Sequence, residues 1–258
     1  MFLLEDWLRE RGASTNQVLA SIGTLSKSDA VIAYCSAMDG LGTAKSDLDV
    51  YVLCDKVPTA GDTGFFNERL GTITQRTTIE SLVLDVEFWP WSATEAVIKH
   101  LRPNDLTLSE VEMSFLARLL SGACLWGDQE CENLRELIHA ANMTDYAVNY
   151  YLLLSNSDLE DALAFFDEGD YRSALYPATN AFYYAMGANN AKNGISIFKT
   201  KWITKIFLEN GSKRFIQAYH DAIIHPLHQD NIGERVESLI RFAQDLNSAS
   251  VSAFDYEE

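Results

Sequence analysis

Residues 30–53 read AVIAYCSAMDGLGTAKSDLDVYVL, and this stretch decides the fold. Its apolar start predicts a strand over 30–34, a loop with two glycines follows, and 46–53 predicts a second strand. Because side chains alternate along a strand, Asp47 and Asp49 share one face, about 7 Å apart. Two carboxylates at the mouth of an apolar strand are costly unless a cation lies between them. A divalent metal such as Mg²⁺ is the first candidate for that cation.

The alternative is that Asp47 and Asp49 lie on the solvated face of an edge strand. Three features favour a ligand site instead. Ser36 ends the first strand, and the loop after it is long enough for its backbone amides to reach a phosphate. A further acidic strand is predicted over 82–89, where Asp85 and Glu87 share a face. A mixed sheet that places this strand beside 48–53 brings one of them to the first two carboxylates.

The segment 34–52 resembles the polymerase-β-like nucleotidyltransferases. It is most similar to the aminoglycoside adenylyltransferases of the streptomycin/spectinomycin type, whose segment runs Y-G-S-A-x-D-G and then S-D-h-D-h, where h is apolar. The matching residues are Tyr34, Ser36, Ala37, Asp39, Gly40, Ser46, Asp47 and Asp49. The chain departs from the family at Cys35, where a glycine lets the backbone approach the nucleotide phosphates, so the cysteine side chain needs room.

The resemblance implies an enzyme that transfers a nucleoside monophosphate, AMP from ATP, to a hydroxyl of a small cationic molecule such as an aminoglycoside. Pyrophosphate is released. It also implies two Mg²⁺ ions held by Asp47, Asp49 and a third carboxylate. The family's third carboxylate is followed by h-x-h, which favours Asp85 and leaves Glu87 as a general base or a residue at the rim of the site. The opposite assignment of Asp85 and Glu87 stays open.

For the nucleotide, the resemblance implies that Ser36 and Ser46 hold the phosphates together with the loop amides. Related enzymes also have a lysine in the helical part of the chain that reaches the triphosphate. Lys199 or Lys201 stands near the corresponding point. A lysine is suited to this role because its ammonium is a compact point charge. The alternative is that both are surface lysines at the start of a helix.

Composition narrows the class of protein further. The 258 residues include 37 acidic and 20 basic side chains, a formal net charge of −17. This charge argues against a nucleic-acid partner and favours a cationic co-substrate. The N-terminus lacks the features of a signal peptide, and no apolar run approaches 18 residues, so we expect neither export nor a membrane span. The four cysteines form no C-x-x-C motif, so we expect no disulfide or zinc site and a cytoplasmic location.

The pattern along the chain predicts an α+β protein in two domains. Residues 1–105 are expected to form the nucleotidyltransferase domain, a mixed sheet flanked by helices. Within it we expect a short helix over 65–70 and a strand over 72–78. From residue 93 the apolar period becomes helical, so 106–258 is expected to be an all-α bundle that binds substrate. The glycines after residue 120 are expected to end a helix.

Two alternative functions remain open. Residues 169–175, GDYRSAL, resemble the helical domains that accompany toxin–antitoxin nucleotidyltransferases, which modify a protein or an RNA. The nuclease form of that domain needs an R-x₄₋₆-H motif, and none starts at Arg172. The second alternative is a catalytically silent relative that keeps the fold, which the cysteine at position 35 favours and the retained aspartates oppose.

Overall fold

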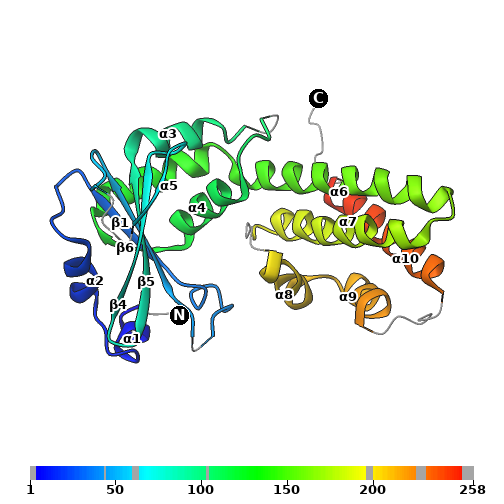
Figure 1. Ribbon diagram of the computed structural model, residues 1–258, viewed down its shortest axis with the longest axis horizontal. Coiled ribbons are helices and arrows are strands. Elements are labelled where there is room, and N and C mark those ends of the chain that lie inside the picture. Colours follow the sequence, from blue (N-terminus) through cyan, green and yellow to red (C-terminus); the bar gives the residue numbers. More distant parts are fainter. Residues whose placement is uncertain are drawn as a thin grey trace. The chain divides into compact units, whose positions relative to one another are not determined.

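The computed structural model describes residues 4–43, 45–59, 64–102, 105–195, 200–224 and 231–251 (Figure 1). The chain forms two compact units. Unit 1 comprises Met1–Leu101 with Val111–Ala141, and unit 2 comprises Arg102–Glu110 with Asn142–Glu258. This division differs from the boundary expected at residue 105, because residues 111–141 return to the sheet.

Unit 1 is built on a six-stranded sheet with the strand order β3-β4-β5-β2-β1-β6. Strands β2 and β5 are parallel, whereas every other neighbouring pair is antiparallel, so the expected mixed sheet is confirmed. Since β2 lies inside the sheet, the edge-strand alternative is wrong. The elements of unit 1 are α1 (Leu4–Arg9), α2 (Thr15–Ile22), β1 (Ala30–Tyr34), β2 (Leu48–Cys54), β3 (Gly64–Asn67), β4 (Thr72–Ile79), β5 (Leu82–Pro90), α3 (Trp91–Lys99), α4 (Glu110–Ser121), β6 (Ala123–Trp126) and α5 (Asp128–Ala140).

Strand alternation divides the central side chains between two cores. On one face, Val50 and Val52 of β2 join a buried cluster that includes Trp7 and Leu8 of α1 and Val18 of α2. On the other face, Tyr51 of β2 and Trp89 of β5 contact Phe115 of α4. The Trp89 and Phe115 rings are stacked 3.6 Å apart. Figure 1 shows α2 and α4 on opposite sides of the sheet. The odd-numbered positions of β2, including Asp49, therefore face α4.

Both edge strands differ from the sequence-based expectation. A short helix is expected over 65–70, but residues 64–67 form β3, which pairs with β4 in a hairpin. Phe65 is 70% exposed there, so its aromatic side chain is not part of the core. Residues 123–126, which were read as the region of a helix end, form β6. This strand pairs with β1 on the opposite edge of the sheet.

The expectation that the chain has no disulfide is wrong. Cys124 of β6 and Cys131 of α5 form a disulfide, with their Cα atoms 6.3 Å apart. The single residue Gly127, at φ 74°, turns the chain between the two elements and brings these cysteines together. Their separation of seven residues gave no C-x-x-C signal. Cys35 and Cys54 are free and buried. The expected cytoplasmic location stays a prediction.

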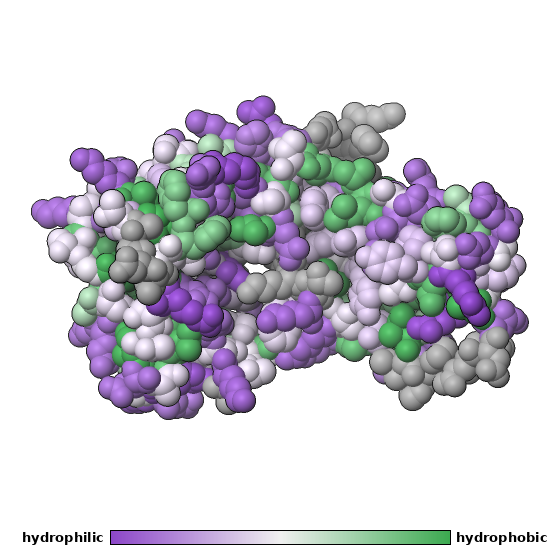
Figure 2. All heavy atoms as spheres, in the orientation of Figure 1, coloured by the Kyte–Doolittle hydropathy of each residue, from purple (hydrophilic) through white to green (hydrophobic). Residues whose placement is uncertain are grey.

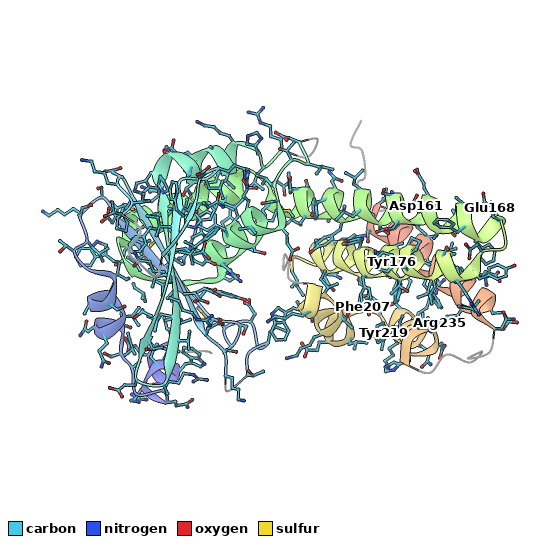
Figure 3. All side chains as sticks on the ribbon, viewed as in Figure 1. Asp161, Glu168, Tyr176, Phe207, Tyr219 and Arg235 are labelled. Carbon is cyan, nitrogen blue, oxygen red and sulfur yellow. A yellow bond between two sulfur atoms is a disulfide. The ribbon has the colours of Figure 1, made fainter. Side chains whose placement is uncertain are left out.

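In the described part of unit 2 every regular element is helical, so an all-α C-terminal region is confirmed from residue 142 on, whereas 111–141 of the expected bundle contributes strand β6 to the sheet. The elements of unit 2 are α6 (Met143–Asp167), α7 (Tyr171–Lys192), α8 (Thr200–Asn210), α9 (Lys213–Tyr219), a π-helical turn η1 (His220–Ile224) and α10 (Ile232–Val251). A buried polar contact ties three helices together, because Ser155 Oγ donates to Ala181 O and accepts from Asn247 Nδ2. Phe207 and Tyr219 are buried between the short helices and α7 (Figure 3).

Hydrophilic side chains cover much of the face of the molecule shown in Figure 2. Among the described residues, no helix combines the length and the apolar character that crossing a bilayer requires.

Gly122 joins α4 to the sheet, and its replacement tests this contact. A Cβ at this position would lie 2.5 Å from Ile32 Cγ2 and 2.7 Å from the Arg118 carbonyl oxygen. We expect Gly122→Ala to lower the free energy of unfolding by about 1–3 kcal/mol, because the end of α4 must move away from β1. Ser121→Ala, at the exposed neighbouring position, is the matched control and should stay within about 0.5 kcal/mol of wild type. Equal stability of the two variants in urea denaturation would contradict the close contact.

Candidate functional site

The loop after β1 is folded back on itself. Tyr34 donates from its hydroxyl to Asp39 Oδ2 at 2.6 Å, and Leu41 N donates to Ser36 O at 2.9 Å. Gly42 packs so closely on the loop that a Cβ there would lie 2.5 Å from Ala37 N. Burial, then the bond to Asp39, raises the pKa of Tyr34 well above its ordinary value. The residues that carry the family resemblance thus hold one another in a compact turn.

The two serines expected to hold phosphate lie together. The Ser36 and Ser46 hydroxyl oxygens are 3.1 Å apart, and Ser46 Oγ accepts a hydrogen bond from Thr43 N at 2.8 Å. The antiparallel register pairs Tyr34 with Asp49. It therefore places Ser36 and Asp47 just beyond the paired ends of β1 and β2. A hydroxyl pair, backbone amides and a carboxylate meet at this end of the sheet.

The Cys35 side chain lies under the start of this loop, where the backbone amides of Ala37 and Met38 donate hydrogen bonds to its sulfur. Its side chain is fully buried in the core cluster on the α1–α2 face of the sheet. Burial raises the pKa of the thiol to about 11, so it stays protonated at neutral pH. A cysteine can therefore replace the family's glycine at this position, because the hydrophobic core accommodates its side chain.

The carboxylates meet along the parallel pair of strands. Asp85 of β5 lies beside Asp49 of β2, and Glu87 lies beside Tyr51. The acidic strand 82–89 thus stands next to 48–53, as expected. Asp47, which precedes β2, is exposed, whereas the Asp49 side chain is 13% exposed. One carboxylate therefore faces solvent at the strand end, and the next lies under α4.

Two arginines, neither of which we expected in the site, pair with these carboxylates. Arg118 Nη1 of α4 lies 3.2 Å from Asp49 Oδ1, and both side chains are nearly buried. The same nitrogen donates to the Tyr51 hydroxyl. Arg76 Nε of β4 lies 3.4 Å from Asp85 Oδ1, with the arginine side chain 66% exposed. The first pair is an internal ion pair, and the second is a surface pair worth about 1 kcal/mol or less.

The electrostatics of this face follow from its burial. Burial raises the pKa of Glu87, although a hydrogen bond from Trp89 Nε1 at 3.0 Å and the charge of Arg118 act in the opposite direction. Burial alone would lower the pKa of Arg118, but Tyr51, Asp49 and Glu87 raise it above its ordinary value. The guanidinium is therefore charged at every accessible pH and is the counter-ion of the inner carboxylates.

The carboxylates of this face could hold Mg²⁺ only together with oxygen atoms supplied by a bound ligand. Within the described ranges, no group of three or more His, Cys, Asp or Glu side chains is arranged to hold a metal ion. Mg²⁺, however, is usually held by one or two carboxylates together with substrate phosphates. Asp47 and Asp49, beside the Ser36–Ser46 loop, meet that smaller requirement.

The expected lysines lie in unit 2. Lys199 falls outside the described residues. Lys201, near the start of α8, is exposed, and its ammonium lies 4.9 Å from the centre of the Trp202 ring. A role of either lysine toward a triphosphate stays a prediction.

Arg118, which lies against the carboxylates, is not among the site residues expected from the sequence. It is the one basic residue of α4, EVEMSFLARLLS, and it stands among buried apolar residues. A single arginine on the apolar side of an amphipathic helix is a usable signal, because such a charge needs a buried partner.

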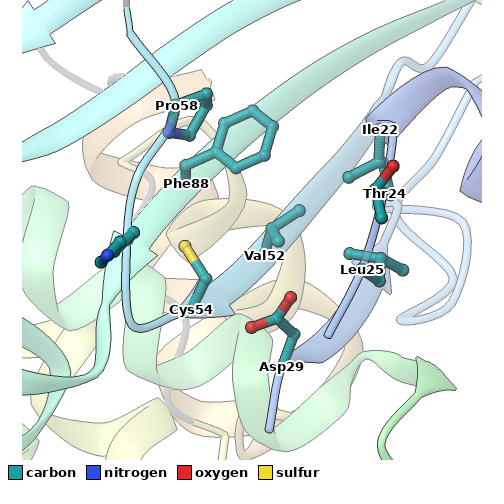
Figure 4. Close-up of a pocket in the computed structure, with 9 residues that line it drawn as sticks. Ile22, Thr24, Leu25, Asp29, Val52, Cys54, Pro58 and Phe88 are labelled. Atoms are coloured by element: carbon teal, nitrogen blue, oxygen red, sulfur yellow. The ribbon is translucent and has the colours of Figure 1, made fainter. Parts of the chain in front are cut away.

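A separate pocket lies at the other end of β2. It has a volume of about 220 Å³ and is lined by Leu25, Asp29, Val52, Cys54 and Phe88 among others (Figure 4). None of the residues expected to act in nucleotide transfer lines it. It is therefore distinct from the carboxylate face.

Comparison with known proteins supports the fold. The chain is similar to the crystal structure of a nucleotidyltransferase-like protein from Exiguobacterium sibiricum, with a TM-score of 0.52 and 9% sequence identity. The match covers 91% of this chain and 73% of the other. No protein-family model matches the chain, and no curated protein matches it in sequence. At this identity the similarity establishes a nucleotidyltransferase-like fold and leaves the activity to be tested.

The raised pKa of Glu87 predicts a specific pH dependence of stability. The folded state keeps the Glu87 proton to a higher pH than the unfolded chain, whose carboxyl titrates near 4.5. As the pH rises above about 4.5, the unfolded state is therefore favoured and the free energy of unfolding falls. Glu87→Gln removes this titration, so its stability relative to wild type should increase from pH 4.5 toward pH 7.5. Urea denaturation across this range measures the difference.

Glu136→Gln, at an exposed position of α5, is the control for this comparison. A Glu87→Gln difference that is the same at every pH, or that shrinks as the pH rises, would contradict the burial of the Glu87 carboxyl.

Proposed function

We propose that this protein is a Mg²⁺-dependent nucleotidyltransferase that moves AMP from ATP to a hydroxyl group of a small cationic molecule. The observation that carries the proposal is the β2–β5 register, which sets Asp85 beside Asp49 at the end of the sheet where the Ser36–Ser46 loop lies. Three carboxylates and a loop that carries two hydroxyl groups lie at one end of the sheet. Such a set suits phosphoryl transfer, which depends on positioning and charge. The nucleotidyltransferase-like fold agrees with this assignment.

For the nucleotide, we assign the phosphates to Ser36, Ser46 and the amides of the loop. Asp47 and Asp49 would hold Mg²⁺, which neutralises charge on the phosphates when it is bound. Asp47 is exposed and thus accessible to an incoming ion. Lys199 or Lys201 is proposed to bind the triphosphate, as in the related enzymes.

For the acceptor, the net charge of −17 favours a cationic molecule such as an aminoglycoside. Its hydroxyl must lose a proton as the oxygen attacks the α-phosphorus. Glu87 is suited to accept it, because burial raises its pKa and a general base works best when its pKa is near the working pH. Asp85 is then the third carboxylate toward the metal.

A second candidate is a catalytically silent nucleotide-binding relative. The observation that favours it is the pairing of Asp49 with Arg118 and of Asp85 with Arg76, which engages two of the three carboxylates with arginines. A silent relative would bind nucleotide without releasing pyrophosphate, so one assay separates the two candidates.

The test is pyrophosphate release from ATP and Mg²⁺ in the presence of streptomycin, spectinomycin and other aminoglycosides. We expect release with at least one acceptor and a loss of at least about 100-fold in Asp47→Asn, equal to about 2.7 kcal/mol of transition-state stabilisation. Asp47 is a better site than Asp49 for this substitution, because it is exposed and its loss leaves the buried ion pair intact. Asp55→Asn, at the other end of β2, is the matched control and should keep wild-type activity.

Thermal melting with ATP and Mg²⁺ completes the test. A ligand that binds the folded state raises Tm by mass action. A shift in Tm without pyrophosphate release from any aminoglycoside would therefore support the nucleotide site and reject an aminoglycoside acceptor, leaving the silent relative and an enzyme with a protein or RNA acceptor. If the protein showed no Tm shift and released no pyrophosphate, the proposed nucleotide site would be rejected. Equal activity of Asp47→Asn and wild type would reject the role of Asp47.

A further inference from the structure

A side chain of the protein, Arg118, supplies the positive charge beside the nearly buried carboxylate of Asp49. Arg118 Nη1 contacts both Asp49 Oδ1 and the Tyr51 hydroxyl, and its guanidinium carbon lies 5.5 Å from the centre of the Tyr34 ring. Its side chain is only 12% exposed. Residues of β1, β2 and α4 thus enclose a fixed positive charge beside Asp49.

The backbone that carries Arg118 is anchored to the sheet. Gly122, which follows α4 directly, allows the helix end to approach Ile32 of β1 closely. Arg135 of α5 donates to the carbonyl oxygens of Leu119 and Gly122, which closes the C-terminus of α4. Phe115, one turn before Arg118, is stacked on Trp89. The position of the guanidinium is therefore set on several sides.

We propose that Arg118 is a positioning residue that takes the place of the second divalent cation of the site. The protein would then bind a single divalent ion with its nucleotide, at Asp47 and the outer side of Asp49. This inference rests on the proposed magnesium–nucleotide site, and it replaces the two ions expected from the family resemblance by one ion and one guanidinium.

The physical reason is that Arg118 and a second divalent ion would compete for the same negative charge, the carboxylate of Asp49. An arginine side chain cannot lose its proton in a protein, so its charge is permanent. A divalent ion on the inner side of Asp49 would be held close to that charge in a poorly solvated place, where like charges repel strongly. Asp47, which is exposed and precedes the strand, lies outside the Arg118 pair.

The test counts bound Mn²⁺, used in place of Mg²⁺, by electron paramagnetic resonance in the presence of α,β-methylene-ATP. This analogue cannot be cleaved at the α–β bond, so the count does not depend on turnover. We expect one Mn²⁺ for each wild-type chain and two for Arg118→Met, with the Kd of the second ion at least about tenfold lower than in wild type. Arg118→Gln, which keeps a polar group near Tyr51, should also bind two.

The matched control is Arg69→Met. Arg69, which lies outside α4, pairs with Glu112 of α4, with Nη2 2.9 Å from Oε2. Replacing Arg69 therefore removes a partner of α4 at a place away from the site. The control should bind one Mn²⁺, which separates an effect of charge in the site from a general loosening of α4.

Each outcome decides the inference. Two ions in the wild-type protein would overturn it and leave the proposed function standing, and this count needs no folded variant. One ion in wild type and still one in both Arg118 variants would also overturn it, because Arg118 would not be what excludes the second ion. No Mn²⁺ bound by any of the proteins would reject the proposed magnesium–nucleotide site itself, and the inference with it.

Discussion

The structure of unit 1 depends on the ion pair between Asp49 and Arg118. Asp49 stands on an interior strand under a helix, with its side chain 13% exposed. A carboxylate in that place, without a positive partner, would cost several kcal/mol or would take up a proton. Arg118 supplies the partner and also bonds the Tyr51 hydroxyl, two residues along the same face. A central strand can therefore carry a charge on the side of the sheet that faces α4.

This pair also explains why α4 belongs with the sheet. The guanidinium reaches Asp49 only if the helix lies close to β1 and β2, and Gly122 permits that approach because a larger residue would collide with Ile32. The chain then continues into β6, which pairs with β1, and into α5, which the disulfide between Cys124 and Cys131 fixes to β6. Residues 111–141 are helical for the most part, yet their packing places them in the α+β unit.

The sequence predicted those parts of the fold that a local pattern records. Alternation identified two strands, over 46–53 and 82–89, and placed Asp47 with Asp49 and Asp85 with Glu87 on one face of each. The register of β2 and β5 then sets Asp85 beside Asp49, a choice that the sequence left open. Helical periodicity identified the all-α part. Strand β6 has only four residues between two glycines, which is too short for a recognisable alternation, and its pairing partner β1 lies far away in the chain. The position of Arg118 on the apolar side of α4 indicates that it needs a buried partner, but the sequence does not identify Asp49 as that partner, since only tertiary packing brings the two residues together.

The motif S-D-h-D-h therefore predicts a positive partner for its aspartates, but it does not distinguish a metal ion from a side chain of the protein. A guanidinium and a metal ion both satisfy a carboxylate, but they differ toward a nucleotide. A metal binds carboxylate and phosphate oxygens at once, whereas Nη1 of the Arg118 guanidinium already contacts Asp49 and Tyr51. The two aspartates of the motif thus differ in kind. Asp49 is paired with Arg118 inside the fold, whereas Asp47 is exposed to solvent.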